Sequence, residues 1–232
     1  MSDILILTHA EFCPPGHLAT VLAQRGLDFR VVRADLGQLA GLDAERPRAV
    51  AIMGGPMSVN DDLPWLGDEL ALLRRFIERR IPLLGHCLGG QLLARVLGAT
   101  VRQQPYTEMG WQPMQRESRA SPWLAHLPER FAIFQWHGDA FDLPQGAERL
   151  LSSAWCENQA FSWGGHVLGL QGHPEMTEEL VRRWIDGWPQ LLDSSQPSQQ
   201  SREAMLADLP LKVAALNRVA EGFYRHWLSL LR

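Results

Sequence analysis

The sequence predicts an α/β protein of three layers, in which helices cover both faces of a mostly parallel sheet. Short apolar runs that are typical of buried strands alternate with longer segments that have helical periodicity. These helical segments are long enough to return the chain for a parallel strand, as a βαβ unit requires. A hydrophobic content of 46% and a charged content of 21% are typical of a globular protein with a substantial core.

The parallel part of the sheet is expected in the first hundred residues. The strand candidates are residues 3–7, 28–33, 48–53 and 81–84. The helix candidates are residues 17–25, 64–80 and 88–97. The last of these helices places an apolar face against the sheet, made of Leu88, Leu92, Leu93, Val96 and Leu97.

The pattern changes after residue 100. Short β-like runs, punctuated by proline and glycine, predict hairpins added to the parallel sheet. They occupy residues 111–115, 131–136, 149–153, 160–163 and 166–171. Residues 177–188 follow as a helix with two acidic residues in its first turn, as the helix dipole favours. Residues 193–201 are polar, and a last helix, interrupted near Pro210, runs toward residue 232.

Charge and cysteine content exclude several classes of function. A net charge of −4, with no basic run interleaved with aromatics, gives no electrostatic basis for binding nucleic acid. Three widely spaced cysteines argue against a disulfide framework and favour a reducing compartment. The sequence shows no signal-peptide pattern and no apolar run that would span a bilayer. We therefore expect a cytoplasmic protein with no membrane partner.

One stretch carries most of the chemical information. Gly85-His86-Cys87-Leu88-Gly89 follows a strand candidate and begins a helix, which is the pattern of a nucleophile elbow with cysteine in place of serine. The helix N-terminus would stabilise a thiolate at Cys87, and the Leu88 N–H would face an oxyanion. The alternative is a buried structural cysteine at a strand–helix junction.

Two further strand ends carry candidate residues. Gly54 and Gly55 follow the third strand, and the Gly55 N–H is a candidate second oxyanion donor. His173 and Glu175 follow the last strand, and residues two apart in an extended segment project to the same side. Since ligands bind at the carboxyl edge of parallel sheets, we expect Cys87, His173 and Glu175 to meet there as nucleophile, base and orienting carboxylate.

Three ordered motifs resemble those of class I glutamine amidotransferases: Met53-Gly-Gly-Pro56, Gly85-His-Cys-Leu-Gly-Gly-Gln91 and Gly172-His-Pro-Glu175. The chain looks most similar to stand-alone members related to the glutaminase domain of GMP synthase. The resemblance implies a flavodoxin-like core and hydrolysis of a γ-carboxamide through a γ-glutamyl thioester on Cys87. It implies His173 as general base and acid, Glu175 as its orienting carboxylate, and oxyanion donors at Gly55 and Leu88. It also implies that Gln91 contacts the α-amino and α-carboxylate end of the substrate.

Two more segments fit the same family pattern. Glu108-Met-Gly-Trp111 resembles the stretch that enters the hairpin region, and Trp136-His-Gly-Asp139 resembles the segment that lines the glutamine pocket. We expect Trp136, His137 and Gly138 to contact substrate. For Asp139 the sequence favours neither a substrate contact nor its absence. The alternative is that the tryptophans are core residues and that His137 caps a turn.

Several functions remain open at this point. The chain is expected to bind a small substrate, glutamine or another γ-glutamyl compound, without a cofactor or a metal ion. It either passes ammonia to a separate synthase subunit or acts alone on γ-glutamyl amides or peptides. An alternative of another class is a non-catalytic regulatory or binding module with this fold. A further alternative is that Cys87 is a redox cysteine, but the sequence shows no resolving partner for it, and Cys13 and Cys156 are more simply explained as buried structural cysteines.

The expected organisation is an amidotransferase-like domain over residues 1–190, a polar linker over 191–201 and a helical extension over 202–232. Nine tryptophans leave apolar surface for an interface, so a homo-oligomer is also open. The extension could cover the sheet, pair with a second copy or bind a partner.

Overall fold

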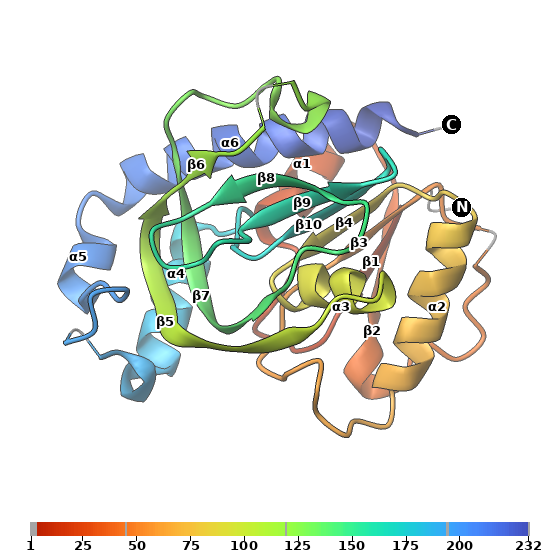
Figure 1. The fold of residues 1–232 in the computed structure, drawn as a ribbon, viewed down its shortest axis with the longest axis horizontal. Coiled ribbons are helices and arrows are strands. Elements are labelled where there is room, and N and C mark those ends of the chain that lie inside the picture. Colours follow the sequence, from red (N-terminus) through yellow and green to blue (C-terminus); the bar gives the residue numbers. More distant parts are fainter. Residues whose placement is uncertain (1–3, 45, 119, 194, 232) are drawn as a thin grey trace.

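A mostly parallel sheet forms the centre of the computed structural model, which describes residues 4–44, 46–118, 120–193 and 195–231. Expectations at residues 3, 194 and 232 lie outside this range. Within the described residues the sheet has eight strands in the order β2-β1-β3-β4-β10-β9-β8-β6 (Figure 1). Five of them are mutually parallel: β1 (Ile4–Thr8), β2 (Phe29–Arg33), β3 (Ala49–Ile52), β4 (Leu83–His86) and β10 (Val167–Leu170).

The hairpin region extends this sheet on one side. Strands β9 (Ala160–Trp163), β8 (Glu148–Ser152) and β6 (Gln115–Arg116) continue it in antiparallel order. Strands β5 (Val101–Pro113) and β7 (Ala132–Phe141) form a separate two-stranded sheet. The first half of β5 and the second half of β7 were not expected from the sequence, which predicted only residues 111–115 and 131–136 there.

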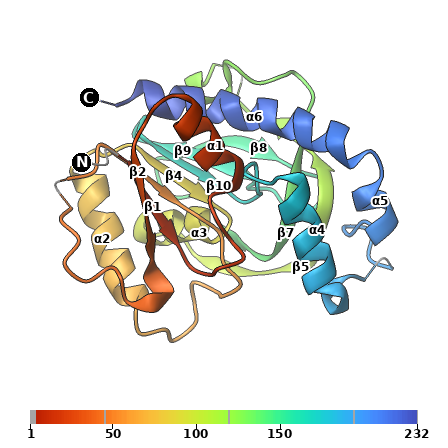
Figure 2. The same ribbon diagram turned by 180° about the vertical axis from the view of Figure 1, so that it is seen from behind.

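Helices cover both faces of the large sheet, so the predicted three-layer architecture is confirmed. On one face lie α1 (Gly16–Gln24), α4 (Glu178–Gly187) and α6 (Leu209–Ser229), which Figure 2 shows in front of the sheet. On the other face lie α2 (Leu66–Glu78) and α3 (Leu88–Val96). Each face of the sheet has its own hydrophobic core: the first lies under α1, α4 and α6, and the second lies under α2 and α3. Side chains of β1 alternate between the faces, so Ile4 and Ile6 belong to the first core and Leu5 and Leu7 to the second.

The C-terminal helices belong to the first of these cores. A short helix, α5 (Arg202–Leu206), precedes α6, and the chain breaks between them at Asp208, which has a positive φ of 52°. Pro210 therefore lies in the first turn of α6 and does not interrupt a longer helix. At this position a backbone N–H would have no acceptor within the helix, so proline costs no hydrogen bond. Phe223, Tyr224 and Trp227 of α6 are completely buried in the same cluster as Leu168 of β10.

The stretch expected as a polar linker is in part packed against β5. A short 3₁₀ helix covers Pro189–Leu191, and the chain then returns alongside β5. The Met109 N–H donates to the carbonyl of Ser198 (3.1 Å), and the Gln200 N–H donates to the carbonyl of Met109 (3.0 Å). Ser198 is completely buried although the sequence around it is mostly polar. Backbone pairing, which composition does not reveal, orders this segment.

Among the described residues, no helix is both long enough and apolar enough to cross a membrane.

Candidate active site

Cys87 occupies a tight elbow between β4 and α3. Its backbone angles, φ 48° and ψ −107°, lie in a region that side-chain-bearing residues rarely adopt, and its N–H donates to the carbonyl of Leu170 (2.8 Å). The elbow depends on close backbone approach. A Cβ at Gly89 would come within 2.1 Å of the Ile52 carbonyl oxygen, and one at Gly90 within 2.4 Å of the Leu170 oxygen. These contacts let α3 begin directly behind Cys87, as the sequence predicts.

His173 and Glu175 follow β10 and face each other. The Nδ1 of His173 lies 2.8 Å from the Oε1 of Glu175. The His173 N–H donates to the carbonyl of Phe134 (2.8 Å), which fixes the backbone of this turn to β7. Both side chains are almost completely buried. The carboxylate therefore orients the ring and leaves Nε2 for another partner.

Cys87 and His173 lie next to each other above Gly54. A Cβ at Gly54 would be 2.9 Å from Cε1 of His173 and 3.7 Å from Cβ of Cys87. The Nε2 of His173 is buried and has no hydrogen-bond partner of nitrogen or oxygen among the described residues. The structure thus brings together the predicted thiol, imidazole and carboxylate from two distant segments.

Burial and neighbouring charges set the pKa values of His173 and Glu175. Burial alone would lower the pKa of His173, but the carboxylate of Glu175, together with the neighbouring Cys87, raises it to about 10. Burial alone would raise the pKa of Glu175, but the His173 ring, with a smaller contribution from His86, holds it well below its ordinary 4.5. At neutral pH His173 is therefore an imidazolium that is paired with the carboxylate of Glu175.

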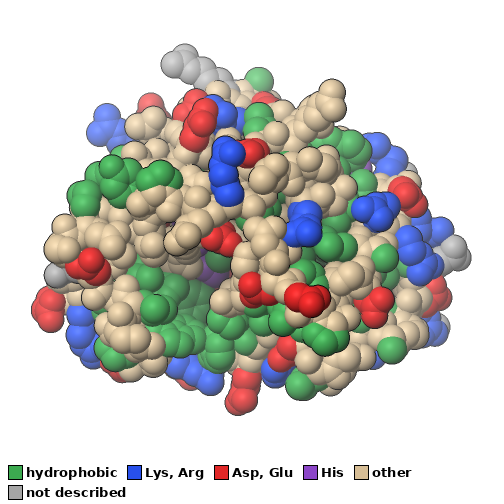
Figure 3. Space-filling view, turned by 60° about the horizontal axis from the view of Figure 1, so that its bottom comes forward, with side chains coloured by type: hydrophobic (Ala, Val, Ile, Leu, Met, Phe, Trp, Pro, Cys, Tyr) green, Lys and Arg blue, Asp and Glu red, His purple; other side chains and the backbone are tan. Residues whose placement is uncertain are grey.

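A cavity of about 510 Å³ opens above Cys87 and His173. Figure 3 shows a hollow on this face, with a histidine at its base and hydrophobic side chains along much of its border. Loops after several strands, strands β5 and β7, and helices α3 and α4 contribute most of the lining, which consists of Phe12, Cys13, Gly55, Pro56, Met57, Ser58, Asp61, Cys87, Gln91, Thr107, Met109, Trp136, His137, Gly138, Asp139, His173, Trp184, Trp188 and Leu191.

The residues predicted to contact substrate reach this cavity. Gln91, Trp136, His137 and Gly138 all line it. The amide nitrogen of Gln91 donates to the Asp139 carbonyl (3.0 Å) and to Oε1 of Gln171 (3.3 Å), so both of its hydrogens are engaged by the protein. Its own oxygen is then the atom that can accept from a ligand.

The predicted oxyanion donors are both close to the thiol. Gly55 lines the cavity, and Leu88 follows Cys87 as the first residue of α3. Leu88 itself is not among the lining residues, because its side chain packs into the second core. Its N–H is one of the first four of α3, which have no acceptor within the helix.

His9 and Glu69 form a buried pair that the sequence did not reveal. The Nε2 of His9 lies 3.0 Å from Oε1 of Glu69, and its Nδ1 lies 3.2 Å from the carbonyl of Gly54. Burial opposes a charge on His9, but Glu69 and the Gly54 carbonyl raise its pKa. Gly54 C=O and Gly55 N–H belong to one planar trans peptide, so holding the carbonyl turns the N–H to the opposite side.

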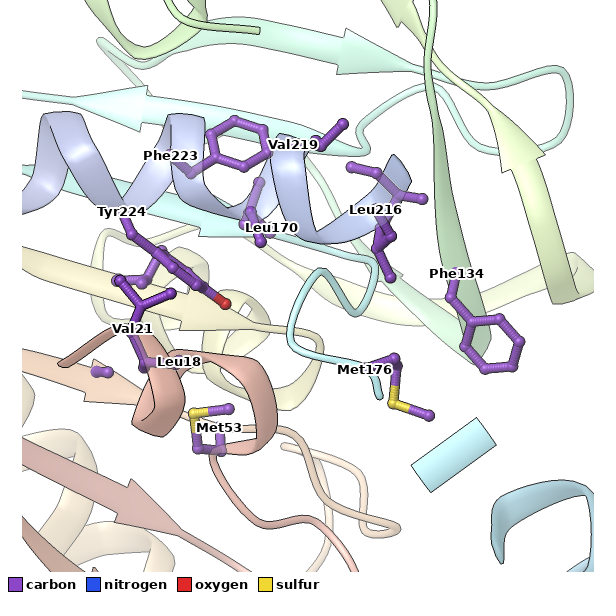
Figure 4. Packing of buried hydrophobic residues seen from close by; sticks show 14 of the residues in the cluster. Leu18, Val21, Met53, Phe134, Leu170, Met176, Leu216, Val219, Phe223 and Tyr224 are labelled. Carbon is purple, nitrogen blue, oxygen red and sulfur yellow. The ribbon is translucent and has the colours of Figure 1, made fainter. Parts of the chain in front are cut away.

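His86 lies behind the candidate triad. Its Nδ1 is 3.0 Å from the second carboxylate oxygen of Glu175, at ion-pair distance but without the alignment of a hydrogen bond. Its ring stacks on Tyr224 with 6.0 Å between centroids. Figure 4 shows Tyr224 projecting from α6 into the cluster that contains Leu18, Val21 and Leu170. The C-terminal helix therefore closes the side of the site away from the cavity.

The sequence contained signals for some of the missed residues. His9 directly follows β1 at the carboxyl edge of the sheet, where Cys87 and His173 also lie. Glu69 is completely buried on the apolar face of α2, a charged residue at a position where the helix pattern calls for an aliphatic one. Gln171, whose amide nitrogen lies 3.8 Å from the Cys87 sulfur, had no distinguishing pattern.

Metal binding and thiol redox reactions are two other kinds of chemistry to consider at the same cavity. Among the described residues, no group of three or more histidine, cysteine or acidic side chains is arranged to hold a metal ion. Cys13 lines the same cavity as Cys87, and burial raises the pKa of its thiol far above the ordinary range. Burial also raises the pKa of Cys156 to about 12. Both are therefore neutral thiols at physiological pH.

The chain is an α/β protein with a cysteine nucleophile elbow at the carboxyl edge of a mostly parallel sheet. Comparison with known proteins identifies the family within this class. The family model for glutamine amidotransferase class-I matches residues 16–183. A crystal structure of a glutamine amidotransferase from Methylobacillus flagellatus aligns with a TM-score of 0.95 at 36% identity, covering 100% of this chain and 96% of that one. The chain belongs to the class I glutamine amidotransferase family and is an enzyme of that class, as its three motifs predict.

Two curated relatives differ in what their names specify. A glutamine-hydrolysing GMP synthase of Thermomicrobium roseum is 38% identical over 132 residues, which are 56% of this chain and 24% of that relative. Gamma-glutamyl peptidase 5 of Arabidopsis thaliana is 30% identical over 164 residues, 68% of this chain and 64% of that relative. This chain thus spans about a quarter of the synthase and less than two thirds of the peptidase.

Proposed function

We propose that this protein hydrolyses the γ-amide of glutamine or of a related γ-glutamyl compound through a thioester on Cys87. The observation that carries the proposal is the arrangement of Cys87, His173 and Glu175 beside Gly54. There the Cys87 and His173 side chains lie together, Nε2 of His173 is free, and Nδ1 is held by Glu175. A buried thiol beside an imidazolium, at the base of a cavity, is the arrangement that nucleophilic attack on an amide requires.

The first half-reaction forms the thioester. The Cys87 thiolate attacks the γ-carbonyl carbon, and the N–H groups of Gly55 and Leu88 stabilise the oxyanion. The carbon–nitrogen bond then breaks while His173 Nε2 gives its proton to the leaving nitrogen, which departs as ammonia or an amine.

Water completes the cycle. His173, now neutral, removes a proton from water as its oxygen attacks the thioester carbonyl. The carbon–sulfur bond breaks, and the thiolate and the imidazolium are restored. The γ-carboxyl group is released and gives the second proton of the water molecule to solvent. Glu175 remains ionised throughout, because its low pKa keeps it a carboxylate while the ring changes charge.

The fate of the leaving group separates two versions of this function. Glutamine hydrolysis follows the name of the glutamine-hydrolysing GMP synthase relative, and in this version the ammonia passes to a separate synthase. Hydrolysis of γ-glutamyl amides or peptides without a partner follows the gamma-glutamyl peptidase relative. Rates of glutamate release from both substrate types, measured with the isolated protein, distinguish the two.

Replacing the nucleophile tests the proposal directly. Cys87→Ala should retain the wild-type circular dichroism and Tm but lose turnover by about 10⁶-fold, since a triad nucleophile acts in both half-reactions. Cys156→Ala is the matched control, because this buried cysteine lies outside the cavity, and it should keep full activity. A γ-glutamyl electrophile should label wild-type protein at Cys87. Measurable hydrolysis by folded Cys87→Ala would reject the proposal.

A further inference from the structure

The cavity above Cys87 has a polar part and an aromatic part. The polar part is connected through Asp139: its carboxylate accepts from the Ser58 hydroxyl (2.7 Å), and its carbonyl is shared by Gln91 (3.0 Å) and His137 (3.1 Å). Asp61 and Thr107 also line the cavity. Carboxylate, hydroxyl and amide groups of this kind suit the ammonium and carboxylate of a γ-glutamyl group.

The aromatic part is a continuous cluster, made of Phe12, Trp136, Trp184 and Trp188. Ring centroids lie 4.6 Å apart for Phe12 and Trp188, 5.9 Å for Trp184 and Trp188, and 6.0 Å for Trp136 and Trp184. The Trp184 indole N–H donates to the Phe12 carbonyl (2.8 Å), which fixes the orientation of that ring. Leu191 continues this aromatic wall to the surface, where it is 45% exposed.

The position of His173 determines how a substrate is oriented between the polar and the aromatic part of the cavity. The leaving nitrogen must lie within reach of Nε2 of His173, because that atom supplies its proton. Trp184 packs against this same imidazole, with 4.7 Å between centroids and an interplanar angle of 85°. A substituent on the leaving nitrogen would therefore extend along the aromatic wall, while the glutamyl end occupies the polar part.

We infer that the physiological substrates are γ-glutamyl amides whose nitrogen carries a bulky apolar or aromatic group. The inference rests on the proposed function and specifies the leaving amine. Ammonia, the leaving group of glutamine, would use none of the aromatic wall. A volume of about 510 Å³ is within the range of pockets that hold drug-sized ligands. Trp184 is only 4% exposed, so a ligand inside the cavity can reach it and a protein docked on the surface cannot.

The test compares two amides of similar reactivity. Isolated full-length protein is assayed with γ-glutamyl ethylamide and γ-glutamyl phenethylamide, whose leaving groups are both primary alkylamines, and with glutamine. Burial of the phenyl group should raise kcat/KM for the phenethylamide by about 10- to 100-fold over the ethylamide. The quantity to follow in variants is this ratio of the two kcat/KM values.

Two tryptophan substitutions test the role of the wall. Trp188→Ala should lower the ratio by about tenfold, because it removes one indole from the wall, and Trp188→Phe should retain most of it. Trp163→Ala is the matched control. Trp163 pairs with Val167 at the opposite end of β10 from the site, so this variant should keep the wild-type ratio.

Three results would overturn the inference. Equal kcat/KM values for both amides would show that the wall does not hold the leaving amine, and glutamine hydrolysis would then leave the proposed function intact. A preference that survives Trp188→Ala would place the phenyl group elsewhere. If no amide is cleaved and an electrophile fails to label Cys87, the proposed function fails as well.

Discussion

Glu175 accepts from His173 with one carboxylate oxygen and has His86 near the other. Its negative charge is a principal reason that the proton on His173 persists to a pH of about 10. A neutral amide in its place would keep the shape of the side chain and remove the charge.

Glu175→Gln should therefore move the alkaline limb of the kcat/KM profile to lower pH by about one to three units. Loss of the charge lowers the pKa of His173, so the imidazolium that protonates the leaving group is lost earlier as pH rises. Glu179→Gln, an exposed change on α4, should leave the kcat/KM profile unchanged. An unshifted alkaline limb in Glu175→Gln would contradict this role.

The same pKa changes make the contribution of the pair to stability depend on pH. The pKa of His173 rises from 6.5 to about 10, so its contribution is complete below 6.5 and is lost as pH rises through 10. The pKa of Glu175 falls below 4.5, so its contribution is complete above 4.5 and is lost on further acidification. The full stabilisation from the pair is therefore present between pH 4.5 and 6.5.

His9 and Glu69 offer a second test at the level of single residues. Double substitution His9→Phe/Glu69→Leu removes the donor to the Gly54 carbonyl without leaving a buried charge unpaired, so the protein should fold. The Gly55 N–H would then lose its fixed direction, and kcat should fall by up to about 10²- to 10³-fold, the cost of losing an oxyanion donor. Steady-state kinetics measure the change.

Glu69→Gln is the control for this double variant. A glutamine amide can donate to Nε2 of His9 and leave Nδ1–H for Gly54, so this variant should retain most of the activity. Wild-type kcat in a folded His9→Phe/Glu69→Leu protein would show that the pair does not position the peptide.

Among the elements, α4 connects the site to the aromatic wall. It begins at Thr177, whose hydroxyl accepts from the Leu180 N–H (3.2 Å), and it carries Trp184 against His173. Its first turn also holds Glu178 and Glu179, which interact favourably with the helix dipole.

Thr177→Ala should lower the free energy of unfolding by about 1 kcal/mol, because the Leu180 N–H loses its cap. Thr177→Ser keeps the hydroxyl and should recover most of this loss. Urea denaturation of the three proteins measures the difference. If Thr177→Ala and Thr177→Ser are equally stable, the cap makes no net contribution.

Sequence reasoning succeeded where an element buries a regular apolar pattern. Strands β1, β3, β4 and β10 are nearly continuous apolar runs between two helical layers, so their composition alone separates them from the rest of the chain. The elbow was found for a related reason, since glycines flank Cys87 at positions where a Cβ would meet backbone.

Prediction failed where pairing is made by the backbone. The start of β5 contains the exposed polar residues Arg102 and Gln103 and a register shift before Glu108, so no alternation marks it. The stretch around Ser198 is polar in sequence, yet its main chain bonds to β5. Buried polar pairs such as His9 and Glu69 were missed because the partners are 60 residues apart.

At the scale of the whole molecule, α6 and the sheet share one hydrophobic core. Phe223 is completely buried in the cluster that includes residues of β1, β3, β4 and β10, and Leu211 on the same helix is 71% exposed. The helix therefore stabilises the protein through one face only.

Phe223→Ala should destabilise the whole protein by about 3–5 kcal/mol, through lost burial and the cavity left behind. Leu211→Ala should change stability by less than about 0.5 kcal/mol, because its side chain is already in water. Global unfolding followed by circular dichroism gives both values. Loss of α6 alone, with the sheet still folded in Phe223→Ala, would show that residues 202–231 are a separable extension.

Three of the nine tryptophans, Trp136, Trp184 and Trp188, stand in the wall of one cavity beside a charged imidazolium. Their emission should therefore be sensitive to whatever enters that space, since an occupant displaces water from the indoles and alters the field from His173. The protein thus carries its own optical reporter. A fluorescence titration of Cys87→Ala with uncleaved amides would rank leaving groups by affinity, without any dye, label or turnover.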